Sequence, residues 1–211
     1  MQKEDKSVFL YSPIIDVYTA VIPKDIKIKE VYPKQRDMEI SGVTSKEVKE
    51  QKYCAWKLLE YALFKTFGTE ITNLEFSKTE YGKWVCNGHY FSISHSHGVV
   101  AVALSTKPVG IDVEKFEPPK NDIAKHIFTD SELEEYFLAK DKWQHVITAW
   151  SKKESVYKKQ GVGNFNPKNI SLCENNIETS NISFKGQEYV LSVCADDLKN
   201  IRYYHDVQNV L

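Results

Sequence analysis

The chain has 211 residues, which is enough for one domain or for two small domains that share an interface. Hydrophobic residues make up 42% of it, charged residues make up 27%, and the formal net charge is −1. This balance is ordinary for a soluble globular protein and gives no support for nucleic acid or a membrane surface as a partner.

Cysteine usage and hydropathy favour a cytoplasmic location. No two of the four cysteines form a CxxC pair, so we expect reduced thiols rather than disulfides or a metal–thiolate site. Residues 1–6 lack the apolar core of a signal peptide. The longest apolar run, residues 99–104, is far too short to cross a bilayer.

The first half of the chain begins with a strand pattern and a long helix pattern. Residues 8–22 alternate loosely, which predicts one or two strands, and the polar segment 24–42 predicts a loop or a short helix. Thr44 is the predicted N-cap of a capping box. Apolar residues then recur at helical spacing as far as Gly68, so we expect a helix over residues 45–67.

The rest of the chain predicts short strands and a second long helix. Residues 94–98 are expected to form a polar turn, and capping boxes begin at Thr129 and Asp141. The box at Asp141 predicts a helix over residues 142–160 that ends at Gly161. Alternating segments predict the strands, at residues 74–77, 90–93, 99–104, 170–172, 182–184, 189–194 and 201–204.

The two long helices carry a similar pattern. Ala55-Trp56 is followed one turn later by Glu60, as Ala149-Trp150 is followed by Glu154, and each helix precedes a glycine. Chance and an internal duplication would both produce this match, so the pattern leaves a repeat open.

One segment alternates apolar and acidic residues: Val109-Gly110-Ile111-Asp112-Val113-Glu114. Side chains on a strand alternate between faces, so Asp112 and Glu114 share one face. Neighbouring carboxylates repel each other unless a cation lies between them, and carboxylates with open positions suit Mg²⁺ shared with substrate phosphates. The same alternation is also typical of a solvated strand face.

The second long helix carries a further acid beside a lysine. Trp150, Glu154 and Lys158 lie one turn apart on one stripe, so Glu154 would hold the same metal while Lys158 contacts a phosphate. Lys153 faces aside and is a secondary candidate. A lysine-rich helix end is otherwise typical of a solvated face.

Together these segments resemble the signature of the 4′-phosphopantetheinyl transferases. The resemblance rests on Gly110-Ile111-Asp112-Val113-Glu114, on Trp150-Ser151-Lys152-Lys153-Glu154-Ser155-Val156-Tyr157-Lys158, and on Phe91-Ser92-Ile93-Ser94-His95-Ser96 preceded by Tyr81-Gly82-Lys83. The length is similar to that of the larger, single-chain surfactin-synthetase-activating type. The sequence departs from the family pattern in Trp84, where proline is usual, and in Ser92, where asparagine is common.

The resemblance implies an α+β fold that is a pseudo-dimer of two similar halves, each a small antiparallel sheet packed with a long helix. Residues 1–105 would form the nucleotide-binding side, and residues 106–211 would carry the metal and the catalytic helix. A single chain of this type implies a monomer.

The implied activity is transfer of 4′-phosphopantetheine from coenzyme A to a serine of an apo acyl or peptidyl carrier protein, which releases adenosine 3′,5′-bisphosphate. Asp112, Glu114 and Glu154 would surround Mg²⁺, and Lys158 would steady the pyrophosphate. Glu154 would act as general base or only as a metal ligand, and the sequence leaves both open.

The nucleotide end of coenzyme A would be bound by Lys83, Ser94 and His95. The first long helix should add a cation for the 3′-phosphate, and Lys52 is favoured among its lysines. Because carrier proteins of this class are acidic helical bundles, we expect a docking face with local basic and exposed apolar residues, around residues 123–128 and 129–138.

Two other functions compete with this hypothesis. One is a catalytically silent module that binds carrier proteins or coenzyme A, against which the complete set of three acids and Lys158 speaks. The other is a Mg²⁺-dependent phosphodiester enzyme that hydrolyses nucleotides, with water as the acceptor.

Overall fold

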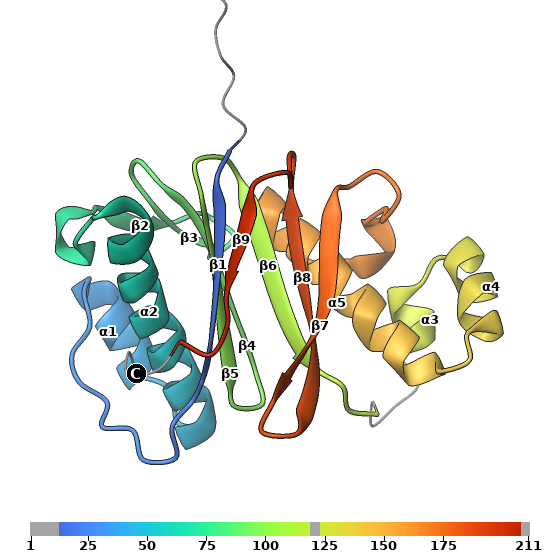
Figure 1. Ribbon diagram of the computed structural model, residues 1–211, viewed down its shortest axis with the longest axis horizontal. Helices are drawn as coiled ribbons and strands as arrows, with labels where there is room; N and C mark the ends of the chain where they lie inside the picture. The colour runs from blue at the N-terminus through green and yellow to red at the C-terminus, as the bar shows by residue number, and fades with distance from the viewer. Residues whose placement is uncertain (1–12, 119–122, 208–211) are drawn as a thin grey trace, which may run out of the picture.

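The computed structural model describes residues 13–118 and 123–207 and has a mixed α+β fold, with small sheets and helices (Figure 1). The helices are α1 Lys34–Ser41, α2 Lys46–Phe67, α3 Ala124–Ile127, α4 Asp130–Leu138 and α5 Lys142–Gln160, with 3₁₀ turns η1 Ile71–Asn73 and η2 Pro167–Asn169. The strands are β1 Ile15–Val21, β2 Phe76–Lys78, β3 Trp84–Cys86, β4 Tyr90–Ser96, β5 Val99–Ser105, β6 Val109–Lys115, β7 Ile177–Phe184, β8 Gln187–Ala195 and β9 Ile201–Tyr204.

Two sheets make up most of the strand structure. One has the order β4-β5-β1-β9 and the other has the order β6-β8-β7, while β2 and β3 form a separate pair. All pairings in these sheets are antiparallel except that of β9 with β1, which is parallel. In each of the sets β1-β5-β4 and β6-β8-β7, the first strand in the chain pairs with the third, and the third pairs with the second. A long helix follows the first strand of each set, α2 after β1 and α5 after β6.

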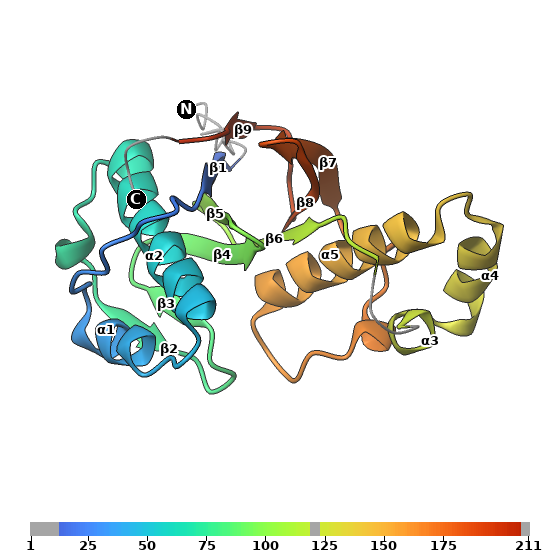
Figure 2. The ribbon, with the colours of Figure 1, turned by 90° about the horizontal axis from the view of Figure 1, so that it is seen from below.

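The alternation of side chains along each strand builds two cores. On β1, Tyr18 and Ala20 pack with α2, whereas Ile15 and Val17 point to the opposite face and join Ile111 of β6 in a core shared by both sheets. Helices α2 and α5 flank the place where β4 and β6 meet (Figure 2). Within the described ranges, none of the helices combines the length and apolar character that crossing a bilayer requires.

The helix predictions from the sequence are largely confirmed. Gly68 and Gly161 end α2 and α5 in the left-handed conformation, and Thr129 and Asp141 cap α4 and α5. The predicted N-cap Thr44 is wrong by one position, because the Ser45 hydroxyl accepts the hydrogen bond from the Val48 amide. The segment 24–42 does contain a short helix, α1.

Several strand predictions need correction. The turn predicted at 94–98 is confirmed only at residues 97–98, because β4 continues to Ser96 and its serines form hydrogen bonds with β6. The strand predicted at 170–172 is wrong, since Ile170 instead follows η2 and packs against α5. Strand β3 was not predicted. The first predicted strand corresponds to β1, and its residues 8–12 lie outside the described part of the chain.

Gly110 allows β6 and α5 to approach each other closely. A Cβ atom at this position would lie 1.9 Å from the carbonyl oxygen of Ser155 and 2.5 Å from the backbone nitrogen of Lys159. Both neighbours are helix backbone, so neither can rotate out of the way. Glycine at 110 therefore fixes how near Asp112 lies to the side chains of α5.

We expect Gly110→Ala to lower the free energy of unfolding by about 2 kcal/mol or more, because the added methyl must push α5 away from β6. Urea denaturation followed by circular dichroism measures the change. Gly42→Ala is the matched control, since its φ is −72° and its Cβ would meet nothing closer than the Met38 carbonyl at 3.4 Å. Equal stability of the two variants would contradict this account of the approach.

Candidate functional site

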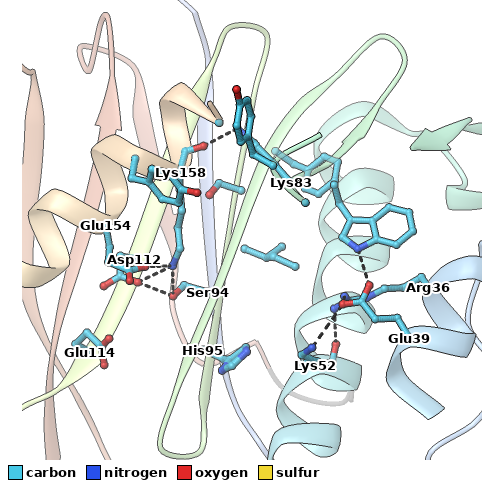
Figure 3. A pocket seen from close by; sticks show the side chains of 18 residues that line it. Arg36, Glu39, Lys52, Lys83, Ser94, His95, Asp112, Glu114, Glu154 and Lys158 are labelled. Carbon is cyan, nitrogen blue, oxygen red and sulfur yellow. Dashed lines mark hydrogen bonds and ion pairs between the residues drawn. The ribbon is translucent and has the colours of Figure 1, made fainter. Parts of the chain in front are cut away.

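A cavity of about 460 Å³ lies between the two halves of the structure (Figure 3). Its walls come from α1, α2, β4, β6, α5 and the segment around Lys83. The carboxylates of β6 and α5 gather at one end and the basic residues of α1 and α2 gather at the other. The charged and polar lining residues are Arg36, Glu39, Lys52, Lys83, Ser92, Ser94, His95, Asp112, Glu114, Glu154 and Lys158.

The acidic end is organised around a buried aspartate. Asp112 is only 1% exposed, and its Oδ1 accepts hydrogen bonds from Lys158 Nζ at 2.7 Å and from Ser94 Oγ at 2.8 Å. Lys158 Nζ also lies 3.2 Å from Glu154 Oε2, one helical turn away. Burial works against a charged lysine, but the two carboxylates outweigh it and raise the pKa of Lys158. The lysine therefore stays protonated between two acids.

Glu114 lies on the same face of β6 as Asp112, as the alternation predicts. Its Oε2 accepts a hydrogen bond from Ser96 Oγ at 2.8 Å. Burial, together with the charges of Asp112 and Glu154, raises the pKa of Glu114 to about 7 against the opposing effects of Ser96 and Lys158. Burial and the charge of Asp112 likewise raise the pKa of Glu154. These acids lie close enough to disfavour each other's charge.

The donor chemistry of this end fits a hard divalent cation. Asp112 Oδ2 is buried and has no hydrogen-bond partner within the described structure, and such an oxygen is normally paired. Mg²⁺ prefers carboxylate oxygens and would relieve the repulsion among the three acids. As the side chains stand, however, no three His, Cys, Asp or Glu side chains in the described ranges converge on one point where an ion would bind. The Lys158 ammonium occupies the position between Asp112 and Glu154 instead.

The basic end contains two residues that the sequence did not single out. The guanidinium of Arg36 is buried, lies 4.7 Å from the Trp56 ring centre and lies 3.2 Å from Glu39 Oε1, while its Nε has no partner among the described residues. Glu39 also contacts Lys52 at 3.5 Å and Lys78 at 2.8 Å. Although burial opposes it, Lys78, Arg36 and the Trp84 indole lower the pKa of Glu39 to about 2. Arg36 and Glu39 were missed because a short polar helix carries no pattern that distinguishes them.

The predicted nucleotide residues Lys83, Ser94, His95 and Lys52 all line this cavity. Burial, together with the charges of Lys158, Lys52 and Arg36, lowers the pKa of His95 to about 4. His95 is therefore neutral at pH 7. Lys83 Nζ donates to the carbonyl oxygen of Lys158 at 2.5 Å and so crosses from the first half to the end of α5.

Two residues of the helix motif lie elsewhere. Trp150 packs against Phe165 at a ring-centre distance of 5.2 Å and does not line the cavity. Lys153 is fully buried and donates to Glu132 Oε2 at 2.7 Å and to the Ile127 carbonyl at 3.0 Å. The alternative interpretation was that β6 and α5 present these residues to solvent. It is wrong for Asp112 and Lys153, because both side chains are buried.

Comparison with known proteins matches the second half of the chain to one family. Residues 108–208 match the family model of the 4′-phosphopantetheinyl transferase superfamily. The chain is 35% identical over 112 residues to 4′-phosphopantetheinyl transferase Sfp of Bacillus subtilis (strain 168), covering 50% of each protein. It is 34% identical over 119 residues to 4′-phosphopantetheinyl transferase gsp of Aneurinibacillus migulanus, covering 54% of this chain and 48% of that protein. The chain thus spans about half the length of the curated relatives that it matches.

We expect Glu114→Gln to stabilise the metal-free protein more at pH 7.5 than at pH 5.5. The pKa of Glu114 is about 7 in the folded state against its usual 4.5. Between these two pH values the folded protein therefore retains a proton on Glu114 that the unfolded chain has released. Stability due to Glu114 is therefore lost as the pH rises from 4.5 through 7, and the glutamine variant escapes that loss.

Scanning calorimetry in EDTA measures the melting temperatures. One pKa unit corresponds to about 1.4 kcal/mol, so the gain of the variant over the parent should grow by about 3 °C or more between the two pH values. Glu135→Gln, at an exposed position of α4, is the control and should show no such growth. A pH-independent difference for Glu114→Gln would contradict the expected titration.

Proposed function

We propose that this chain, which belongs through residues 108–208 to the 4′-phosphopantetheinyl transferase superfamily, transfers 4′-phosphopantetheine from coenzyme A to a serine hydroxyl of an apo acyl or peptidyl carrier protein. Adenosine 3′,5′-bisphosphate is the other product. The observation that carries the proposal is one cavity with a three-carboxylate end that contains Lys158 and an opposite end that contains Arg36 and Lys52. Coenzyme A has a pyrophosphate and a distant 3′-phosphate, so it offers negative charge to both ends.

Asp112, Glu114 and Glu154 are the residues that would hold Mg²⁺. The partnerless Oδ2 of Asp112 and the mutual repulsion of these acids support this assignment. When bound, the ion neutralises charge on the pyrophosphate as the phosphoryl group transfers.

The chain's own residues supply the proton transfer and the second positive charge. The carrier serine oxygen forms a bond to the phosphorus that bears pantetheine, and the P–O bond to the adenosine portion breaks. Glu154 takes the serine proton, and burial supports this role because it raises the pKa of Glu154 toward that of an effective base. Lys158, which is held protonated by Asp112 and Glu154, stabilises the negative charge on the leaving phosphate.

The nucleotide portion would lie along the rest of the cavity. Lys83 and Ser94 would contact the phosphates nearest to Lys158, since both already bond to that residue. Neutral His95 would donate a ring N–H to the 3′-phosphate, and Lys52 would supply charge there. We add Arg36 to this group, because its buried guanidinium has a donor without a partner in the described structure.

We further propose that the two halves, residues 1–105 and 106–211, form a pseudo-dimer of two related units. The common order of β1-β5-β4 and β6-β8-β7, each with one long helix, supports this. The triplets Ile15-Asp16-Val17 and Ile111-Asp112-Val113 occur on the corresponding strands. In α2 the position matching Lys158 is Phe64, so only the second unit retained the chemistry.

Helix α4 is the proposed contact for the carrier protein. Phe137 and Leu138 at its end are 60% and 86% exposed, which is unusual for such large apolar side chains, and Lys140 and Lys142 follow directly. The earlier turns of α4 are acidic, so the basic contribution to docking would come from its C-terminal end.

We expect Asp112→Asn and Glu154→Gln each to reduce transfer by about 100-fold or more, because both alter the acids at the reacting phosphate. The protein is incubated with coenzyme A, Mg²⁺ and an apo carrier protein, and the carrier is weighed by mass spectrometry. Glu60→Gln, at the matching position of α2, is the control and should keep the parent rate.

The same assay separates the three candidate functions. A carrier that gains phosphopantetheine supports transfer. An unchanged carrier with consumed coenzyme A would show a hydrolase, and no consumption at all would show a silent binding module. Either of these results would overturn the proposal.

We expect His95→Ala to raise the KM for coenzyme A about tenfold while kcat stays within about twofold, since His95 lies toward the basic end and away from the reacting phosphate. Steady-state kinetics at saturating carrier measure both constants. His89→Ala is the control, because His89 stacks on Phe67 and does not line the cavity. An effect on kcat alone would contradict the placement of His95 on the nucleotide.

A further inference from the structure

Strand β4 presents a row of serines to β6. Ser92, Ser94 and Ser96 lie on one face of β4, each about 5% exposed or less, and β4 and β6 belong to different sheets. Their hydroxyls bridge the two strands where no backbone ladder does. Figure 2 shows the ribbons of β4 and β6 next to each other, and the hydrogen bonds of the row place it directly beside Asp112 and Glu114.

The three serines differ in what they bind on β6. Ser92 Oγ accepts from the Ile111 amide at 3.1 Å and contacts no carboxylate in the hydrogen bonds described. Ser96 Oγ accepts from the Lys115 amide at 3.2 Å and also lies 2.8 Å from Glu114 Oε2. Ser92 is thus a purely structural bridge, whereas Ser96 reaches one of the acids.

The direction of the Ser96 proton follows from its partners. An amide N–H only donates, so Ser96 Oγ accepts from the Lys115 amide, and its hydroxyl donates to Glu114 Oε2. The His97 ring nitrogen Nδ1 lies 3.1 Å from the same oxygen. The rigid β6 backbone is in this way connected through Ser96 to the end of a flexible glutamate side chain.

Glu114 needs such an anchor because it has several rotatable bonds and lies beside the charge of Asp112. Repulsion alone would turn it away from the acidic end of the cavity. Among the described residues, Ser96 is the only hydrogen-bond partner of its carboxylate. Groups that orient metal-binding carboxylates typically change metal affinity by 10–100-fold when they are removed.

We propose that Ser96 is a positioning residue that holds Glu114 beside Asp112 so that both acids can bind the divalent ion. This inference rests on the metal assignment in the proposed function. Ser96 itself touches neither the ion nor the substrate.

Binding of Mn²⁺, which is paramagnetic and replaces Mg²⁺, tests this without coenzyme A or carrier protein. The ion is titrated into each purified protein, and free Mn²⁺ is measured by electron paramagnetic resonance. We expect Ser96→Ala to raise the Kd for Mn²⁺ about tenfold, while Ser96→Thr, which keeps the hydroxyl, and Ser92→Ala, which loses only a structural bridge, stay within about twofold of the parent.

A double variant makes the test specific to Glu114. In a Glu114→Gln background, Ser96→Ala should cause no further loss of Mn²⁺ affinity. Should Ser96→Ala fail to fold, Ser96→Cys, whose thiol is a weak donor, is titrated in its place with the same expected loss.

Unchanged affinity in the Ser96 variant, or an equal loss in Ser92→Ala, would overturn the inference. A parent protein that binds no Mn²⁺ would also overturn it. The transfer reaction is judged separately by the mass of the carrier, so failure of the positioning role and failure of the proposed function give different results.

Discussion

The buried contact between the Lys158 ammonium and the Asp112 carboxylate is the interaction on which the site depends. Removing two charges from water costs several kcal/mol, so such a pair persists only with close geometry and additional hydrogen bonds. Gly110 supplies the geometry, because it lets β6 lie against the backbone of α5. Ser94 and Glu154 supply the other hydrogen bonds to the ammonium. The pair also uses only Oδ1 of Asp112 and leaves its buried Oδ2 without a hydrogen-bond partner in the described structure.

The two ends of the cavity carry different charged groups. The end near Asp112 combines acids with one lysine, while the end near Arg36 and Lys52 is held by the single carboxylate of Glu39. Neutral His95 contributes hydrogen-bonding capacity without adding charge. The two ends of the cavity therefore differ in charge, with three carboxylates around one lysine at the first end and a guanidinium and a lysine around one carboxylate at the second.

Local patterns were enough to predict which residues of the acidic end share a face or a helical stripe, but not their surroundings. Alternation along β6 correctly placed Asp112 and Glu114 on one face, and helical spacing correctly placed Glu154 beside Lys158. Whether that face was solvated depended on β4 and α5 packing over it, which is a long-range contact that no local pattern encodes. The same reason explains why the turn predicted at 94–98 begins only at residue 97, since polar serines are typical of turns unless a partner strand forms hydrogen bonds with them.

The basic end shows the same limit more strongly. Arg36 and Glu39 come from a short polar helix whose composition suits a solvated loop. They become site residues only because α1 packs on α2, where the Arg36 guanidinium lies over Trp56 and Glu39 accepts from the Trp84 indole. Trp84, which makes this contact, stands where the family pattern has proline. The basic end therefore depends on tertiary packing, whereas the placement of the acids at the other end follows from local patterns.

The two buried aspartates Asp16 on β1 and Asp112 on β6 differ in how their carboxylate oxygens are paired. Both aspartates follow isoleucine and precede valine on corresponding strands, and both are 1% exposed. Asp16 is fully paired, because Arg202 of β9 donates Nε to Oδ1 at 2.6 Å and Nη2 to Oδ2 at 2.8 Å, with Thr66 also donating to Oδ2. Asp112 receives its lysine on one oxygen alone. A planar guanidinium satisfies both carboxylate oxygens and leaves no place for a metal, whereas an ammonium satisfies one. Strand β9 thus supplies a guanidinium that pairs both oxygens of Asp16, whereas Asp112 keeps one buried oxygen without a hydrogen-bond partner among the described residues.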